Sequence, residues 1–211
     1  WNIGGQDRDI DRITWNAQHN TINIDSLTLR SGDSHIVCQG FYNTARDMDF
    51  DISAHDIDLA RSVLVRKKYP LDGVVNGTLR ISRGEEDPTI VPSVDMSIKN
   101  LGIDESYIGN LSVAVKADLG NKYISTAATL DRKGKRTLDI HGGINIKEKA
   151  LVPDIYIKMD SLDVAPVHYL LPSVFNKSSG TLSADLSMVE GNMTVPNING
   201  YISLNDVNLG I

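Results

Sequence analysis

The stretch NLSVAVKADL, Asn110–Leu119, decides how this chain is expected to fold. Every second residue in it is apolar, namely Leu111, Val113, Val115, Ala117 and Leu119. Successive side chains of a β-strand point to opposite faces of a sheet, so a period of two predicts a strand with one apolar face.

The same alternation recurs along the chain, and turn-forming Gly, Asp, Asn and Lys residues separate the segments at intervals of roughly ten residues. The clearest further examples are residues 47–56, 123–130, 137–146, 153–159 and 180–188. We therefore predict a mainly β fold of about a dozen strands.

Short phrases also repeat in the same order at a separation of about 105 residues, as expected of a repeat protein. The matched pairs are IVCQGFYN (Ile36–Asn43) with LDIHGGIN (Leu138–Asn145), HDIDLA (His55–Ala60) with DSLDVA (Asp160–Ala165), NGTLRIS (Asn76–Ser82) with SGTLSAD (Ser179–Asp185), and NLGI (Asn100–Ile103) with its copy at Asn208–Ile211. They predict two continuous β-repeat units, 1–103 and 104–211.

One segment in each unit departs from the period of two. Leu59–Pro70 and Val164–Phe175 space their apolar residues three and four apart, and each follows an aspartate that can cap a helix. We predict one short helix per unit, after Asp58 and after Asp163.

The composition of the chain argues against some classes of function. The chain has 211 residues, a net charge of −6 and a single cysteine, Cys38, so nucleic acid is an unfavourable partner and no internal disulfide can form. No run of 18 apolar residues and no signal peptide is present. Because the chain starts at Trp1 and its pattern continues to Ile211, we interpret it as a processed chain or a piece of a longer protein.

Alternation alone does not separate a closed sandwich from an open, curled sheet. Three features favour the open form. The apolar set is nearly all aliphatic, with aromatics at only 6% of residues; the opposite set is dense in Asp, Asn, Lys and Ser; and the pattern runs to the last residue without a polar cap. We therefore predict an elongated curled β-sheet, a repeating β-groove.

The C-terminal third then resembles a known family. DSLDVAPVHYLLPS (Asp160–Ser173) and SSGTLSADLSMVEGNMTVPNINGYISLNDVNLGI (Ser178–Ile211) look like the C-terminal half of TamB proteins and, more loosely, the AsmA-like group. The shared elements are Leu162–Asp163, a helix near Val167–Leu171, Gly180–Leu186, Gly191–Pro196 and Ile198–Leu204. The first unit departs from this pattern, since it lacks a counterpart of Gly200 and inserts RGEED before Pro92.

The resemblance implies a segment of a β-groove protein in the periplasm of a Gram-negative bacterium, anchored in the inner membrane, without a cofactor, a metal or catalytic residues. It implies phospholipid or another apolar ligand as cargo and an outer-membrane β-barrel as assembly partner. The residues predicted to line the groove are Phe50, Ile52, Leu79, Ile81, Met96, Ile98, Leu111, Val113, Val115, Leu138, Ile140, Ile144, Ile155, Ile157, Leu182, Leu186, Ile198, Ile202 and Leu204.

Three other segments invite a site hypothesis. DRDIDR (Asp7–Arg12) alternates acids as a calcium loop does but lacks its glycine and final glutamate, which favours a solvated strand face. HDID (His55–Asp58) offers an imidazole beside carboxylates, and we interpret it as a helix entry rather than a metal or general-base site. VRKKY (Val65–Tyr69) is interpreted as a solvated helix end, with anionic headgroups as the alternative contact. Cys38 is expected to be a small buried apolar residue.

Two alternative functions stay open at this level. Two β-sandwich binding modules of a surface protein would suit units of this size, and a β-helix enzyme on polysaccharide would need clustered carboxylates and stacked aromatics. Uncovered edge strands also predict edge-to-edge homo-oligomers of such a segment.

Overall fold

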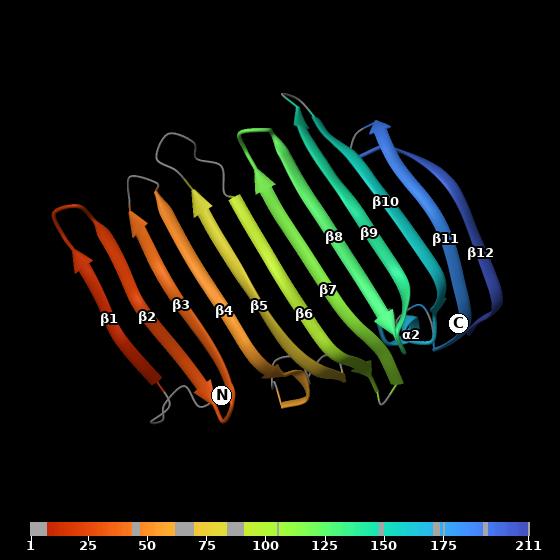
Figure 1. Cartoon of the computed structure of the whole chain (residues 1–211), viewed down its shortest axis with the longest axis horizontal. Coiled ribbons are helices and arrows are strands. Elements are labelled where there is room, and N and C mark those ends of the chain that lie inside the picture. The colour runs from red at the N-terminus through yellow and green to blue at the C-terminus, as the bar shows by residue number, and fades with distance from the viewer. Residues whose placement is uncertain are drawn as a thin grey trace.

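The computed structural model describes residues 8–43, 47–61, 70–83, 91–104, 106–147, 150–170, 174, 176–191 and 194–210. Twelve antiparallel strands form one open sheet, and each strand pairs with its neighbours in sequence (Figure 1). The strands are β1 (Arg8–Asn16), β2 (Thr21–Ser31), β3 (Ser34–Asn43), β4 (Met48–Asp58), β5 (Leu71–Arg83), β6 (Val91–Ile103), β7 (Ser106–Asp118), β8 (Tyr123–Arg132), β9 (Lys135–Lys147), β10 (Ala150–Asp163), β11 (Lys177–Gly191) and β12 (Pro196–Gly210).

The sheet is continuous across residue 104, the boundary between the two predicted units. β6 pairs with β7, and Ile98 lies directly opposite Leu111. The prediction of an elongated open β-sheet is therefore confirmed. The described strands form neither a pair of sandwiches nor the parallel coils of a β-helix.

Side-chain burial follows the predicted period. Along β7, Leu111, Val113 and Val115 are half-buried, whereas the intervening Ser112 and Ala114 are exposed. We call the side that carries the alternating apolar residues the apolar face and the opposite side the polar face.

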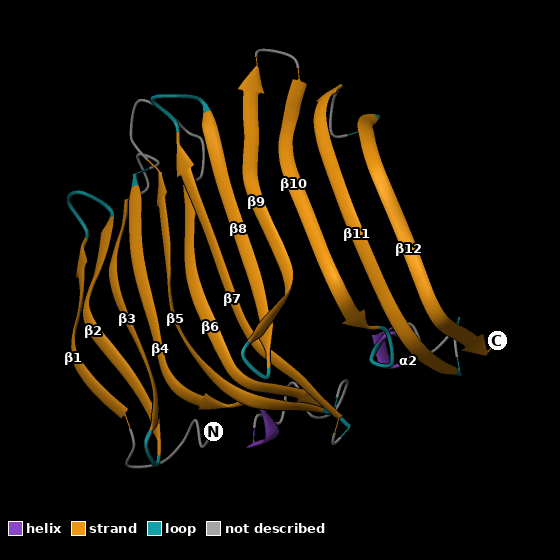
Figure 2. Cartoon of the chain, turned by 45° about the vertical axis from the view of Figure 1, so that its right-hand side comes forward, coloured by secondary structure: helices purple, strands orange, loops and turns teal. Residues whose placement is uncertain are grey.

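One long margin of the sheet, where the even-numbered strands end, carries repeated bulges. Asp56, Asn100, Ser161 and Asp206 have positive φ values of 50°, 53°, 50° and 50°, and the pairing register shifts beside each of them. A bulge bends its strand and increases the local twist. Figure 2 shows the strands bending toward this lower margin.

Both described helices lie at the same margin. The 3-10 helix η1 (Leu59–Arg61) follows β4, and the α-helix α2 (Val167–Leu170) follows β10. The backbone N–H of Ala60 donates to Asp58 Oδ1, and that of Ala165 donates to Asp163 Oδ1, each with N and O 2.9 Å apart. The predicted cap is thus confirmed for Asp58, which directly precedes η1, whereas Ala165 lies two residues before α2, so Asp163 orders the turn that leads into that helix. Residues 62–69, 171–173 and 175 of the two predicted helical segments lie outside the described residues.

The register corrects one of the repeat matches. The backbone N–H of Asp56 donates to Asn76 Oδ1, and that of Ser161, at the equivalent bulge, donates to Ser183 Oγ. Asn76 therefore corresponds to Ser183, and not to Ser179 as the phrases NGTLRIS and SGTLSAD suggested.

Candidate functional site

The apolar face is built from rows of residues that lie directly opposite one another on successive strands. One such row passes through all twelve strands. From β1 to β12 it comprises Ile10, Leu27, Cys38, Ile52, Leu79, Val94, Val115, Thr126, Gly142, Ile155, Met188 and Ile198. No member of this row carries a charge.

The neighbouring row on the same face has the same character. From β2 to β12 it comprises Leu29, Ile36, Ala54, Gly77, Met96, Val113, Ala128, Ile140, Ile157, Leu186 and Gly200. The two rows together form an uncharged band along the long axis of the sheet.

The register places every residue predicted to line a groove on this face. Those outside the two rows lie beside them, such as Phe50 opposite Ile81, Ile98 opposite Leu111, and Leu182 opposite Leu204. The predicted lining residues lie on β4 and later strands, where the register shifts fall near the strand ends, so alternation in sequence keeps them on one face. In β1 and β2 the register also shifts in mid-strand, between Ile10 and Ile13 and between Ile24 and Leu27.

This face is not filled by the protein's own atoms. Of the apolar residues described, apart from glycines, only Ile103, Leu130, Pro153, Ile155, Val164 and Ala184 are nine-tenths or more buried. The accessible surface of the chain is 13675 Å², whereas a compact monomer of 23.1 kDa would expose about 9,700 Å². The additional accessible surface is expected of a single sheet that no second layer covers.

The uncharged band has a distinct hollow between β4, β5 and β6. Ala54 lies opposite Gly77, and Gly77 lies opposite Met96, so two adjacent positions carry almost no side chain. The hollow measures about 210 Å³ and its lining is almost wholly apolar. The sequence did not predict this hollow, because Ala54 and Gly77 come together only through the strand pairing.

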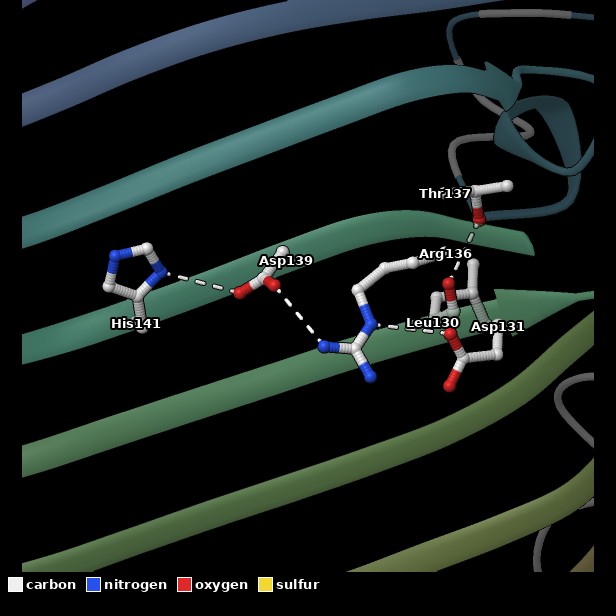
Figure 3. A network of polar contacts seen from close by, with 6 residues as sticks. All are labelled: Leu130, Asp131, Arg136, Thr137, Asp139 and His141. Carbon is white, nitrogen blue, oxygen red and sulfur yellow. Dashed lines mark hydrogen bonds and ion pairs between the residues drawn. The ribbon is translucent and has the colours of Figure 1, made fainter. Parts of the chain in front are cut away.

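Charged side chains gather on the polar face. Arg80 forms a two-pronged contact with Asp49, with N–O distances of 3.0 and 2.6 Å, and this contact raises the pKa of Arg80. Further along, Arg136 joins Asp131 and Asp139, each at 3.3 Å, and Asp139 contacts His141 (Figure 3). These pairs are exposed and keep the outer side of the sheet hydrated.

The His141 ring stacks on Tyr156 of the next strand, with centroids 5.5 Å apart. The adjacent Thr137 is buried and donates to the Leu130 carbonyl, as Figure 3 also shows. This network braces β8, β9 and β10 on the polar face.

At the lower margin, α2 is tied down by a buried serine. Ser178 is 5% exposed; its hydroxyl donates to the Ala165 carbonyl and accepts from the His168 backbone N–H, at 2.9 and 3.1 Å. The Tyr169 hydroxyl donates to Asp104 in the β6–β7 turn, which raises the pKa of that tyrosine. The helix thus links the β10–β11 connection to the middle of the margin.

Ion pairs continue along this margin. Arg132 contacts Asp163 at 2.8 Å, and Lys135 contacts Asp160 at 3.0 Å. The hydrogen bond from Lys135, with a second from Ser161, lowers the pKa of Asp160. The margin is therefore polar and the band beside it is not.

The structure describes some of the remaining predicted segments and leaves others outside the described residues. His55–Asp58 forms the end of β4, where Asp58 caps η1 and the His55 ring stacks on His35 with centroids 4.5 Å apart. Arg8–Arg12 belongs to β1, while Asp7 and Val65–Tyr69 lie outside the described residues. Within the part of the chain that the structure describes, no three His, Cys, Asp or Glu side chains are placed to hold a metal ion.

Cys38 is half-buried in the first row of the apolar face, opposite Ile52. Burial raises the pKa of its thiol. A thiol that stays protonated behaves as a small apolar group, as expected.

Among the described residues, no helix has the length and apolar composition needed to cross a bilayer. Comparison of the chain with models of protein families, with curated proteins and with solved structures gave no match.

Proposed function

We propose that this chain is a non-enzymatic segment of a cell-envelope β-groove protein, and that its apolar face shelters phospholipid acyl chains during their passage across the periplasm. The observation that carries the proposal is the uncharged band of two residue rows from β2 to β12. With strands about 4.8 Å apart, twelve of them give the band a length of roughly 55 Å.

The energetics support a hydrocarbon ligand. Each methylene group that leaves water for an apolar surface gains about 0.8 kcal/mol, so even partial burial of an acyl chain is favourable. A charged headgroup would stay in solvent beside the polar margin. In this arrangement the protein needs no specific contact at any one strand, which suits movement along the band.

The backbone favours lipid over polypeptide as the ligand of this face. The N–H and C=O groups of the central strands pair with both neighbours, for example at Leu79, which lies between Ile52 and Val94. A peptide lying on this face would find no backbone partners, and burying its own amides would cost free energy. A hydrocarbon chain has no such requirement.

The resemblance to TamB proteins supports the place of action. It agrees with a periplasmic segment of a protein anchored in the inner membrane of a Gram-negative bacterium, with an outer-membrane β-barrel as partner. The open β-groove architecture and the aliphatic lining are the features that the chain has in common with that family.

The test is a pair of adjacent aspartate variants, Val115→Asp on the apolar face and Ala114→Asp on the exposed polar face. The purified proteins are checked for folding by circular dichroism and assayed for co-purified phospholipid by native mass spectrometry and for transfer of fluorescent phospholipid between vesicles. Val115→Asp should lose lipid and transfer, and Ala114→Asp should retain both. Equal behaviour of the two folded variants would contradict the proposal.

A further inference from the structure

We propose that the hollow over Ala54 and Gly77 is a resting site that holds one unbranched hydrocarbon chain in a fixed position, and this inference rests on the proposed lipid function. The rest of the uncharged band would bind chains without a preferred position. We call this hollow the Gly77 hollow.

The shape of the Gly77 hollow follows from backbone packing. A Cβ atom at Gly77 would lie 2.4 Å from the Asp95 carbonyl oxygen and 2.8 Å from the Met96 Cα, distances that real Cβ atoms do not show. Only glycine fits there, and the small Ala54 lies directly opposite it. The absence of side-chain volume is thus required by the approach of β5 to β6.

The walls of the hollow are apolar and larger. Ile52 and Leu79 lie on the row above it, and Val75 and Met96 border it on the other sides. Elsewhere in the same row, Ala128 is flanked by Val113 and Ile140 and has no glycine beside it. A hydrocarbon chain that moves along the band therefore meets at Ala54 and Gly77 a pair of opposed small residues that the row lacks at Ala128.

The size fits a segment of a lipid tail. At about 210 Å³, the hollow far exceeds the roughly 10–15 Å³ that one water molecule needs in a cavity, so it has room for several methylene groups. The floor consists of strands whose ladders are complete on both sides, so a polypeptide gains no hydrogen bonds there. The chemistry of the hollow therefore selects the hydrocarbon tail of a lipid.

The experiment uses two single-cysteine variants in a Cys38→Ser background, Ala54→Cys in the hollow and Ala128→Cys on the same row outside it. The probe is lauroyl lysophosphatidylcholine below its critical micelle concentration, and the readout is the rate at which a hydrophilic maleimide alkylates each thiol. We expect the ligand to slow alkylation at position 54 at concentrations that leave position 128 unprotected.

Each other result has a defined meaning. Equal protection at both positions, or protection at position 128 alone, would overturn the resting site and leave the proposed function standing. No protection at either position up to the critical micelle concentration would contradict the proposed function itself. The two failures are therefore distinguishable.

A second pair of variants tests the same site by filling it. Ala54→Leu should lower the affinity for the lysophospholipid by about tenfold, the equivalent of roughly two methylene groups left in water. Ala128→Leu, the matched substitution outside the hollow, should change it by less than about twofold. An unchanged affinity in a folded Ala54→Leu protein would overturn the inference.

Discussion

The side-chain oxygen of Asn76 accepts a hydrogen bond from the backbone N–H of Asp56 across the β4–β5 ladder, with N and O 3.0 Å apart. The same arrangement recurs at two other bulges, where Asn100 N–H donates to Asn110 and Ser161 N–H donates to Ser183, at 2.8 and 3.0 Å. In each case the left-handed residue would otherwise leave a backbone donor outside the ladder. The same kind of hydrogen bond, from a backbone N–H to a side-chain oxygen on the next strand, thus stabilises three bulges of the lower margin.

The first prediction concerns the hydrogen bond between Asp56 and Asn76. Asn76→Ala removes the acceptor of the Asp56 N–H and should lower the free energy of unfolding by about 1 kcal/mol, the usual net value of a hydrogen bond. Urea denaturation measures the change. Asn199→Ala, at an exposed asparagine of β12, is the control and should stay within about 0.5 kcal/mol of the parent. Equal effects of the two variants would contradict the role of Asn76.

The second prediction concerns Gly142, which lies in the uncharged band with φ 125°. Its Cβ would lie 2.0 Å from the Asp154 carbonyl oxygen on β10. Gly142→Ala should therefore disturb the β9–β10 ladder and cost at least about 2 kcal/mol, from overpacking and backbone strain together.

Gly134→Ala provides the matched control for Gly142. Gly134 has φ 77°, but no atom lies within 4 Å of the position that its Cβ would take, so its substitution carries only the cost of the backbone conformation. This cost should be about 1 kcal/mol. Thermal unfolding of the two variants compares them, and a larger loss for Gly134→Ala would refute the steric argument.

The third prediction concerns the hydrogen bonds that hold α2 against β11. Ser178→Ala leaves the backbone N–H of His168 without its buried acceptor, which should cost about 1–3 kcal/mol, while the Ala165 carbonyl keeps its contact with the His168 ring at 2.7 Å. Hydrogen exchange should become faster in α2, and the adjacent Ser179→Ala variant should leave exchange there unchanged. Unchanged protection of α2 in Ser178→Ala would show that the serine does not hold the helix.

The fourth prediction is a dependence on pH. Lys135 and Ser161 lower the pKa of Asp160 in the folded chain. A lowered pKa means that ionised Asp160 stabilises the folded chain above the unfolded pKa, about 3.9, and that this contribution is lost as the pH falls through the folded pKa. Asp160→Asn should thus be less stable than the parent at pH 7, and the difference should vanish in acid.

A double-mutant cycle with Lys135→Gln tests the cause of this dependence. The pair is exposed, so the coupling energy should be small and should decrease at high salt. A coupling that persists at about pH 2, where carboxylates are largely protonated, would contradict an ionic origin.

Much of the fold could be predicted because one face of each strand must be apolar. The alternation at Leu111, Val113 and Val115 predicted the face on which those side chains lie, and Asp58 predicted the entry of η1. Asp163 predicted the turn before α2 but not its first residue. These signals are local, since they depend on residues only a few positions apart.

The register between strands was harder to predict. The phrase containing Asn76 matched one containing Ser179, yet the structure aligns Asn76 with Ser183. Short β-phrases stay alike when they slide by two or four residues, because such a slide keeps each side chain on its face. The bulge bonds, which set the register, join residues on different strands and have no local signature.

The Gly77 hollow was missed for a related reason. It arises where Ala54, Gly77 and Met96 fall opposite one another on three strands. Each of these residues is ordinary within its own strand. Only the pairing brings the two small ones together.

The most direct test of the central claim compares two adjacent alanines of β8. Ala128 lies on the apolar face in the row of Val113 and Ile140, and the exposed Ala127 lies on the polar face opposite His141. A photo-crosslinking amino acid is placed at each position in turn, and the protein is irradiated with radiolabelled phospholipid vesicles. An open, lipid-bearing apolar face predicts crosslinked lipid from position 128 and little from position 127. Equal labelling at both positions, or none at position 128, would contradict it.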